Sequence, residues 1–435
     1  MIKVAKFGGS SLATSEQFKK IKDIIFKDKT RSVIVVSAPG KKDDSDHKIT
    51  DLLYLIYAHI KYGVDCTKIF NIIKERYLEI KNNLGLKTAI EEEFLALEKS
   101  FSKTMSEEFL VSRGEYFCAK LMAEYLNYDF VDAKDIVFFN YEGKIDEQKT
   151  TDAVKKLFLI SKKIVVPGFY GAYPDGSIHL FSRGGSDVTG AVLAKFTAAT
   201  IYENWTDVSG FLVADPKIVH NPKKIREISY EELRELSYMG ANVLHEDTIF
   251  PVQELDIPIN IKNTNRPDEE GTVISSKCQD ASQIITGITG KKLYESITII
   301  KKPKASKIQV IQNVLDILEK YNINIEHIPS SIDTFSLIIE RTSLAKQKYE
   351  IIAEIKKNDN VQDVIVDNDI ALIAIVGRNM ATKPGISAKI FSIFGQNDIN
   401  IKVIAQASQE LSIIIGVANN QFEKAIKAVY DCLIV

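Results

Sequence analysis

The chain has 435 residues, which is long enough for two or three domains with sizeable cores. Hydrophobic residues make up 45% and charged residues 26%, as in ordinary soluble proteins, and the formal net charge of −2 excludes a general attraction to nucleic acids or anionic membranes. The first residues lead straight into a strand-like run without a signal-peptide pattern, and no apolar stretch is long enough to span a bilayer, so we expect a cytoplasmic protein.

The chain begins with a strand-like run at 2–7, which contains Lys6 and ends in the glycine turn Gly8-Gly9-Ser10. Apolar residues at helical spacing follow at 18–25, and a nearly all-apolar strand follows at 32–37, as expected for a strand buried on both faces of an α/β sheet. Ligands of α/β folds bind at the carboxyl ends of strands, so Lys6 and the glycine backbone are placed to bind phosphate. The spacing of a P-loop is absent, both here and at Gly287 to Lys292.

A charged loop at 41–48 precedes Thr50, which stands where a helix through Tyr57 is predicted to begin. Thr50 is therefore either the N-cap of that helix or a substrate contact. Residues 64–127 are predominantly helical in pattern. Glu115 is either a first-turn glutamate that suits the helix dipole or a side chain that faces a ligand.

The sheet resumes at 164–170, and a hairpin turn at 174–176 leads to the stretch Phe181 to Gly190. Two adjacent glycines at a loop-to-helix junction let the backbone approach a ligand, and the start of the helix favours an anion. Arg183 adds a planar fork for a carboxylate, and Asp187 adds a negative charge for an ammonium group or a magnesium ion. The stretch predicts a site for a zwitterion beside a phosphate, or else a solvated glycine turn.

The next strand, at 201–205, ends in a turn that is rich in acidic and hydroxyl side chains. Thr206, Asp207, Asp215 and Lys217 either form part of a nucleotide pocket or belong to Asx-type turns. A helix at 230–238 and a strand at 258–264 complete this part, with a domain boundary near residue 283.

The remainder of the chain contains a repeat. The first βαββαβ unit is predicted as strand 297–301, helix 306–321, strands 323–328 and 335–339, helix 344–355 and strand 361–366. The second is predicted as strand 371–377, helix 386–395, strands 399–405 and 411–417 and helix 421–430, without a last strand. We expect residues 284–288 to fill that sheet edge, so that the first unit, about 293–368, is inserted within the second, about 284–292 plus 369–435.

The segments Lys6 to Ser11, Ser182 to Asp187 and Trp205 to Gly210, together with the paired repeats, resemble the aspartate kinase family with tandem ACT domains over essentially the whole chain. The resemblance implies an α/β protein: an amino-acid-kinase fold in residues 1–283, with a mostly parallel central sheet between helices, and two ferredoxin-like ACT domains in residues 284–435. It implies transfer of phosphate from Mg-ATP to the β-carboxylate of L-aspartate, the first step towards lysine, threonine and methionine. A fused homoserine dehydrogenase is not expected.

The resemblance also implies roles for individual residues. Catalysis would fall to Lys6, Arg183 and Asp187, and aspartate would be held by Thr50, Glu115, Arg183 and Asp187. ATP would be held by Lys6, Gly8, Gly9, Ser10, Ser37, Ser186, Thr206, Asp207, Asp215 and Lys217. No metal site made by protein side chains is expected, and the cysteines Cys66, Cys118, Cys278 and Cys432 lack the spacing of a disulfide framework or a zinc site.

Two departures from the family pattern concern the nucleotide. Asn242 stands where many members have lysine, and Lys217 stands where they have arginine, so a cation is lost and a bidentate fork becomes a point charge. Both put the strength of ATP binding in question, and neither touches the aspartate pocket.

Regulation by lysine, threonine or both is implied by the ACT units, with effector contacts at Ser306, Asn324, Ile325, Met380, Asn400 and Ile401. Association through residues 284–435 into a homodimer or homotetramer is also expected. The alternatives are another kinase of the same fold, acting on glutamate, N-acetylglutamate or a nucleotide monophosphate, and a catalytically weak amino-acid sensor.

Overall fold

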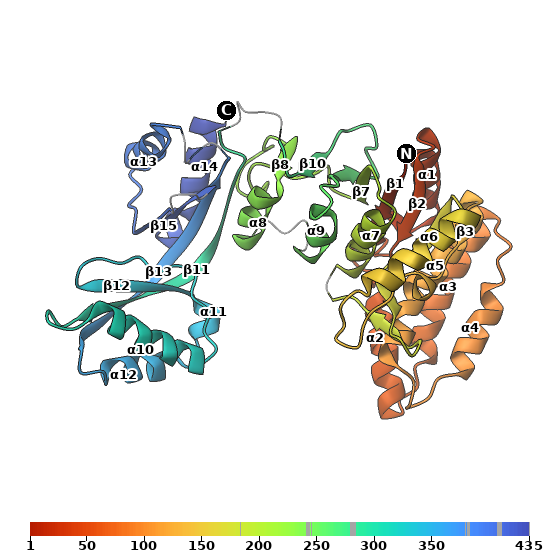
Figure 1. The fold of residues 1–435 in the computed structure, drawn as a ribbon, viewed down its shortest axis with the longest axis horizontal. Coiled ribbons are helices and arrows are strands. Elements are labelled where there is room, and N and C mark those ends of the chain that lie inside the picture. The colour runs from red at the N-terminus through yellow and green to blue at the C-terminus, as the bar shows by residue number, and fades with distance from the viewer. Residues whose placement is uncertain are drawn as a thin grey trace. The chain divides into compact units, whose positions relative to one another are not determined.

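The computed structural model describes residues 1–182, 184–240, 244, 246–278, 284–378, 380, 383–406 and 411–434, without the side chains of Glu246 and Asp247. The chain forms two compact units (Figure 1). The first comprises Met1–Phe211, Arg226–Tyr230 and Val243–Cys278, and the second comprises Leu212–Ile225, Glu231–Asn242 and Gln279–Val435. Two segments that precede residue 283 thus pack with the second unit, and the predicted domain boundary stays a prediction.

The first unit is built on an eight-stranded sheet in the order β3-β4-β2-β1-β7-β9-β10-β8. All neighbouring strands are parallel except β9 and β10, which confirms the prediction of a mostly parallel sheet. The strands are β1 Lys3–Phe7, β2 Arg31–Val36, β3 Asp129–Phe130, β4 Ile164–Pro167, β7 Ile201–Thr206, β8 Glu227–Ser229, β9 Ile259–Asn263 and β10 Thr272–Ser275. The predicted hairpin pairs β5 Tyr170–Ala172 with β6 Ile178–Leu180.

Some helices of this unit start at residues whose side chains cap the first turn. The Thr14 hydroxyl accepts the N–H of Gln17 at 3.4 Å at the start of α1, and Ser106 accepts the N–H of Phe109 at 3.3 Å at the start of α5. The helices are α1 Ser15–Lys27, α2 Ile49–Tyr62, α3 Thr67–Leu84, α4 Ile90–Lys99, α5 Glu107–Leu126, α6 Glu147–Ile160, α7 Gly185–Phe196 and α9 Glu246–Gln253; α8 Tyr230–Tyr238 packs mostly with the second unit.

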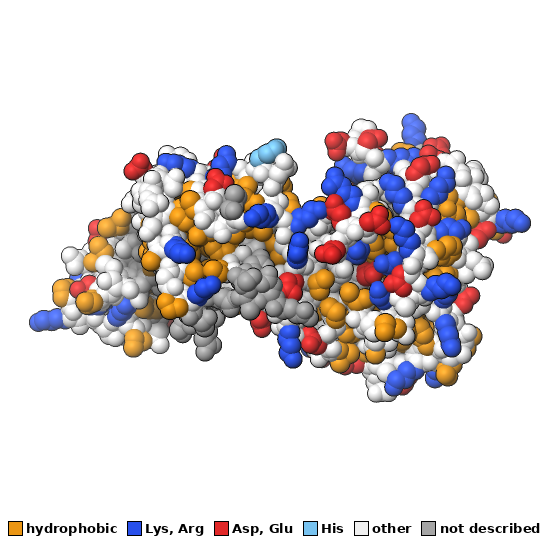
Figure 2. All heavy atoms as spheres, turned by 90° about the horizontal axis from the view of Figure 1, so that it is seen from above, with side chains coloured by type: hydrophobic (Ala, Val, Ile, Leu, Met, Phe, Trp, Pro, Cys, Tyr) orange, Lys and Arg blue, Asp and Glu red, His pale blue; other side chains and the backbone are white. Residues whose placement is uncertain are grey.

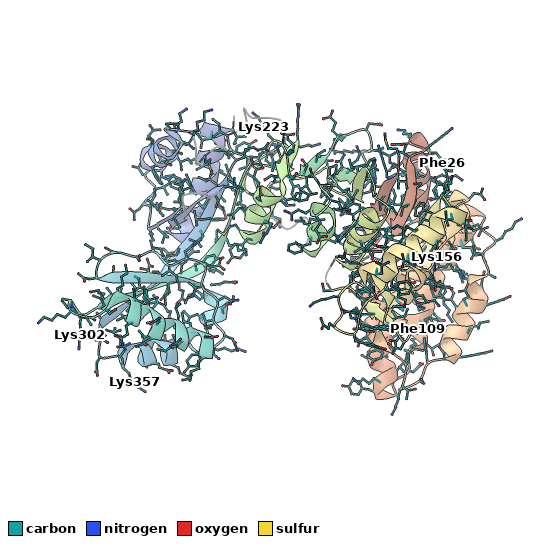
Figure 3. All side chains as sticks on the ribbon, viewed as in Figure 1. Phe26, Phe109, Lys156, Lys223, Lys302 and Lys357 are labelled. Carbon is teal, nitrogen blue, oxygen red and sulfur yellow. The ribbon has the colours of Figure 1, made fainter. Side chains whose placement is uncertain are left out.

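Aromatic side chains fix the helices over the sheet. Phe94 lies 4.4 Å from Phe117 and 5.9 Å from Tyr77, measured between ring centroids, and these rings tie α4 and α3 to α5. This packing holds α5, which carries Glu115, in a fixed position against the sheet. Phe26 and Phe109, by contrast, lie at the surface and are 51% and 37% exposed (Figure 3).

The second unit contains a five-stranded antiparallel sheet in the order β12-β11-β13-β15-β14. Its strands are β11 Gly287–Lys301, β12 Thr334–Glu340, β13 Val361–Val376, β14 Val403–Ala405 and β15 Ser412–Val417. Its helices are α10 Lys307–Lys320, α11 Arg341–Leu344, α12 Lys348–Lys356, α13 Ile386–Gln396 and α14 Phe422–Leu433. The confirmed fold class is therefore α/β, with a parallel sheet in one unit and helices on an antiparallel sheet in the other.

Two long strands run through both repeats. Residues 287–291 of β11 pair with the end of β13, and residues 294–301 pair with its beginning. The strands predicted separately at 297–301, 361–366 and 371–377 are therefore parts of β11 and β13. The sequence pattern divided each of these long strands because exposed residues at 291–293 and 368–369 interrupt the apolar pattern. The hydrogen-bonded ladder continues past them.

Other predicted elements of the second unit are shorter than expected. Residues 323–328 form no regular strand, only isolated bridges such as His327 with Ile338, and Pro329, which follows, has no N–H to donate to a ladder. The strand expected at 399–405 is confined to Val403–Ala405, and the helix expected from Leu344 starts at Lys348.

Lysine and arginine side chains are interspersed with acidic ones over the right-hand part of the face shown in Figure 2, in keeping with the small net charge. Over the residues that the structure describes, no helix has the length and apolar character needed to cross a membrane. Cys66, Cys118 and Cys432 are free thiols; Cys66 and Cys118 are buried and Cys432 is exposed.

Candidate active site

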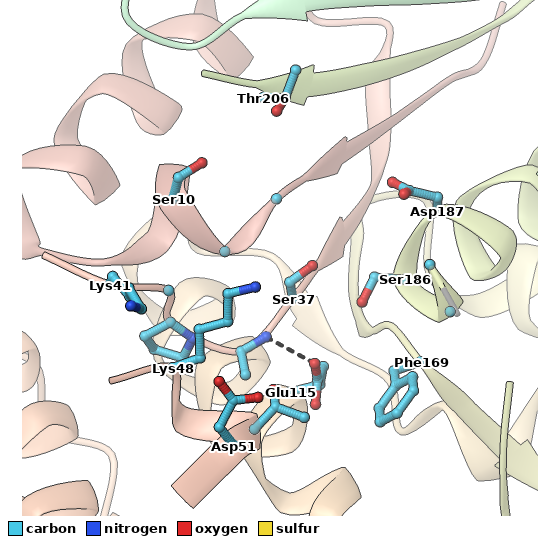
Figure 4. A pocket seen from close by; sticks show the side chains of 18 of the residues that line it. Ser10, Ser37, Lys41, Lys48, Asp51, Glu115, Phe169, Ser186, Asp187 and Thr206 are labelled. Carbon is cyan, nitrogen blue, oxygen red and sulfur yellow. Dashed lines mark hydrogen bonds between the residues drawn. The ribbon is translucent and has the colours of Figure 1, made fainter. Parts of the chain in front are cut away.

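A cavity of about 1130 Å³ opens at the carboxyl ends of the parallel strands β1, β2 and β7 (Figure 4). All of its lining residues belong to the first unit. The predicted site residues that line it are Lys6, Gly8, Gly9, Ser10, Ser37, Thr50, Glu115, Ser186, Asp187, Thr206 and Asp207. Carboxyl ends of parallel strands meet at one sheet edge, which is why motifs far apart in sequence converge here.

The β1 glycine loop lies directly against the loop after β2. Gly40 donates its N–H to the Gly9 carbonyl at 2.8 Å, and a Cβ at Gly40 would lie 2.6 Å from the Gly9 carbonyl carbon. Gly8 donates its N–H to the Trp205 carbonyl at 2.9 Å, so this N–H is not available to bind phosphate. The predicted backbone donation to phosphate therefore falls to Gly9 and Ser10.

This close approach makes a testable prediction. The Gly40→Ala change is expected to push the two loops apart, because the clashing atoms are backbone, and to lower the free energy of unfolding by about 1–3 kcal/mol together with ADP affinity. Calorimetric unfolding and ADP titration measure both. Gly395→Ala is the control, since its added Cβ meets nothing within 4 Å; equal effects of the two changes would contradict the contact.

Lys6 reaches from β1 to Asp187 in the first turn of α7. The Lys6 ammonium forms an ion pair with Asp187 Oδ1, and these side chains are only 8% and 20% exposed. Asn204 of β7 donates its Nδ2 to the same Oδ1 at 2.9 Å, and the Tyr202 hydroxyl donates to the Asp187 carbonyl at 3.0 Å. The charge of Asp187 is thus held in place from two neighbouring strands.

Asn204 was missed as a site residue by the sequence analysis. The sequence signal that could have found it is a polar residue within an otherwise apolar strand. Asn204 is 5% exposed, and its Oδ1 has no partner within the described part of the chain. Buried polar atoms are nearly always paired, so an unpaired oxygen is unusual here; Asn204 does not line the cavity itself and supports Asp187, which does.

The predicted loop-to-helix junction at the two glycines is confirmed, and the helix begins at the second of them, Gly185. Gly184 has φ +70° and precedes α7, and a Cβ at Gly185 would lie 2.4 Å from the Phe169 ring. The Asp187 and Val188 N–H groups donate to the Gly184 carbonyl. Arg183, predicted to hold aspartate, lies outside the described residues, and so does Asn242.

Glu115 lies in the middle of α5, not in its first turn, so the helix-dipole interpretation of this residue is wrong. Its Oε1 accepts the N–H of Ala38 at 3.0 Å, while its buried Oε2 has no partner among the described residues. Burial raises the pKa of Glu115 to about 7, against the lowering effects of the Ala38 N–H and the Arg113 charge. Glu115 lines the cavity, and a buried carboxylate with one unpaired oxygen is suited to a cationic group of a ligand.

Thr50 is not the N-cap of α2. The cap position is Lys48, the helix begins at Ile49, and Thr50 lies within the first turn at the cavity. The N-cap interpretation is therefore wrong, because the loop before the helix ends earlier than the pattern indicated. Substrate contact remains the prediction for Thr50.

The residues predicted to hold the nucleotide divide into two groups. Thr206 and Asp207 line the cavity, and the Thr206 hydroxyl donates to Asp207 Oδ1 at 3.1 Å. Asp215 and Lys217 belong to the second unit and are not among the lining residues; Asp215 Oδ1 accepts the Lys217 N–H at 2.8 Å, as in an Asx turn. Their nucleotide role stays a prediction.

The residues predicted to bind an effector lie at two places of the second unit. Ser306 is the N-cap of α10, and Asn324 and Ile325 follow that helix. Met380 is buried, and Asn400 and Ile401 lie between α13 and β14. Their role also stays a prediction.

Comparisons with known proteins agree with this geometry. The family model described as the amino acid kinase family matches residues 1–263, and an ACT domain model matches residues 373–433. Aspartokinase 3 of Bacillus subtilis is 35% identical over 447 residues, covering 99% of this chain and 98% of that protein. The crystal structure of Clostridium acetobutylicum aspartate kinase, 47% identical, has a TM-score of 0.94 and covers 99% of this chain and 100% of that one.

Escherichia coli aspartokinase III is less similar to this chain in sequence. Its complexes with aspartate and ADP and with lysine and aspartate, each 23% identical, give TM-scores of 0.74 and 0.77 over the whole of both chains. At this level of identity the likeness concerns the fold.

Proposed function

This chain belongs to the aspartokinase family, and from this premise we propose that it transfers the γ-phosphoryl group of ATP to the β-carboxylate of L-aspartate, giving 4-phospho-L-aspartate and ADP. The observation that carries the proposal is the content of one cavity: a glycine loop with Lys6 beside Asp187, and Glu115 with a free carboxylate oxygen. The first part is suited to phosphate and the second to the ammonium group of an amino acid.

In the proposed reaction, a β-carboxylate oxygen of aspartate forms a bond to the γ-phosphorus, and the bond to the bridging oxygen breaks as ADP leaves with its electron pair. The attacking carboxylate is already ionised at pH 7, so no general base is needed. Catalysis then consists of positioning and charge neutralisation. No histidine is among the lining residues that the structure describes.

The predicted site residues that line the cavity have the following places in this scheme. Lys6 faces the transferring phosphoryl group, with Gly9 and Ser10 as backbone donors and Ser37 and Ser186 as hydroxyl donors. Glu115 and Thr50 hold aspartate together with Arg183 and Asp187, and Thr206 and Asp207 hold the nucleotide. The E. coli protein solved with aspartate and ADP supports this pair of ligands.

Magnesium fits the site as a partner of the nucleotide. Within the described residues there is no group of three or more His, Cys, Asp or Glu side chains that could hold a metal ion, but Asp187 and Asp207 line the cavity. Mg²⁺ commonly binds through one or two carboxylates and substrate phosphates, where it neutralises phosphate charge. Asp187 and Asp207 are the residues that would hold it.

We also propose feedback regulation by lysine, threonine or both through the second unit, and association of chains into a dimer or tetramer through it. The ACT match at residues 373–433 and the E. coli protein solved with lysine support the regulation. Closed symmetric oligomers are the common form of such assemblies.

Release of ADP from Mg-ATP tests the proposed function. Turnover is expected to require L-aspartate, to be at least tenfold lower with L-glutamate or N-acetylglutamate, and to fall when lysine or threonine is added. Turnover insensitive to both amino acids would contradict the regulation alone. Turnover that does not depend on aspartate would contradict the kinase proposal and favour a related kinase or a sensor.

A further inference from the structure

The lysines of the cavity differ in their charge partners. Among the described residues that line it, the lysines are Lys6, Lys41 and Lys48. The charge of Lys6 is balanced by Asp187. Neither Lys41 nor Lys48 forms a side-chain hydrogen bond or an ion pair with any residue in the described part of the chain, so their charges are available to a ligand.

Lys48 has a fixed backbone at the edge of the cavity. The next residue, Ile49, is fully buried and donates its N–H to the Pro39 carbonyl at 3.4 Å, and the Lys48 carbonyl accepts the Leu52 N–H at 3.1 Å. Both lysine side chains are exposed, but Lys41 lies within the loop 41–48, whereas Lys48 directly precedes the buried Ile49 at the start of α2. Figure 4 shows the Lys48 side chain extending from the start of α2 towards Ser37, with Ser186 and Asp187 on the opposite side of the pocket.

The local structure gives no reason for a lysine at this position. Lys48 is the N-cap residue of α2, with φ −70° and ψ 138°, and it makes no side-chain capping hydrogen bond. Helix N-caps favour Ser, Thr, Asp or Asn, whose oxygens accept backbone N–H groups, and a cation at this end opposes the helix dipole. A lysine here is unfavourable for the helix, so helix capping does not account for it.

We propose that Lys48 is a catalytic residue whose ammonium group contacts the γ-phosphoryl group during its transfer to the acceptor carboxylate; this inference rests on the proposed function. Lys48 comes from the side of the cavity that carries Thr50, two residues further along α2, whereas Lys6 comes from β1. The two cations thus approach the phosphoryl group from different elements. Lys48 forms no covalent bond and loses no proton; its charge offsets the charge that spreads over the phosphoryl oxygens.

The Lys48→Met variant tests the proposal. Its kcat is expected to fall on the order of 100-fold, with the dissociation constant of ADP within about twofold of wild type, because the lost contact belongs to the transition state. Lys48→Arg is expected to recover part of kcat. Lys42→Met is the matched control, because Lys42 belongs to the same loop, pairs with Glu79 and does not line the cavity, and it is expected to keep wild-type kcat.

The Lys48→Ser variant separates catalysis from helix capping. Serine is a better N-cap, so this variant is expected to keep or raise the thermal midpoint while losing as much kcat as Lys48→Met. A kcat of Lys48→Met within threefold of wild type would overturn the proposal, as would a loss of activity that appears only together with a lower thermal midpoint. If the wild-type protein showed no aspartate-dependent turnover, the proposed function itself would fall, and the role of Lys48 with it.

Discussion

The Lys6→Met variant is expected to lose turnover on the order of 1000-fold, because the charge removed is nearly buried and, in the proposed reaction, faces the transferring phosphoryl group. An interaction of this kind is strongest where solvent is excluded, and Lys6 is only 7% exposed. The loss should appear in kcat and not in the KM for aspartate. Steady-state kinetics of ADP release measures both.

Stability provides a second readout for Lys6. Without the ammonium group, the Asp187 carboxylate keeps Asn204 but loses its ion pair, so the free energy of unfolding is expected to fall by about 1–3 kcal/mol. The double variant Lys6→Met with Asp187→Asn should recover that stability and remain inactive. Recovery of activity in the double variant would contradict the catalytic role.

Lys3→Met is the matched control for Lys6. Lys3 lies on the same strand, and its ammonium pairs with Asp28 at 2.8 Å, with no place in the cavity lining. Its removal is expected to leave kcat within about twofold of wild type, since it touches neither ligand. A comparable loss of turnover in the two variants would show that the effect of Lys6 is not specific to the cavity.

The Glu115→Gln variant is expected to raise the KM for aspartate roughly 100-fold, because an amide cannot balance a buried ammonium charge. The KM for ATP should stay near the wild-type value. Glu107→Gln is the control, since Glu107 is an exposed residue in the first turn of the same helix. An equal change of both KM values would contradict the assignment of Glu115 to aspartate.

The pH dependence of kcat/KM tests the assignment of Glu115 to aspartate independently. The pKa of Glu115 is raised to about 7, and in the proposed function its ionised form binds the ammonium group of aspartate. At saturating Mg-ATP, kcat/KM for aspartate is therefore expected to fall about tenfold per pH unit once the pH is well below 7. The Glu115→Gln variant should lack this midpoint, while Glu107→Gln should keep it.

The pH dependence of the free energy of unfolding of the ligand-free protein is expected to run opposite to that of kcat/KM. Because the pKa of Glu115 is higher in the fold than its ordinary value of 4.5, its contribution to stability is complete below pH 4.5 and is lost as the pH rises to about 7. Ligand-free Glu115→Gln protein is therefore expected to be more stable than wild type at pH 8, by roughly 3 kcal/mol, with the difference vanishing towards pH 4.5. Denaturant unfolding at both pH values measures it.

The sequence by itself determined whether most elements are helices or strands, and it indicated that the main motifs lie close together. The apolar run of β2 and the helical spacing in α1 report burial along one segment, which depends on neighbouring residues alone. The lysine of β1, the serine after β2 and the threonine of β7 could be grouped as well, because carboxyl ends of parallel strands share an edge.

Only the tertiary structure decided which partner each polar group has. Ala38 and Glu115 are 77 residues apart, yet the N–H of one and the burial around the other set the charge state of the carboxyl group. The ion pair of Lys6 with Asp187 and the hydrogen bond of Asn204 to Asp187 likewise join segments that are far apart in the sequence. Burial and pairing depend on distances between segments, and the period of a single segment does not contain them.

The second unit shows the same limit in its sheet. The sequence revealed the repeat, because each helix and strand has its own apolar pattern, but it divided β11 and β13 where exposed residues interrupt that pattern. A ladder continues through such residues when the partner strand runs alongside. The sequence thus determined the elements and the chemistry available to them, and the tertiary structure determined how far each strand extends and which charges meet.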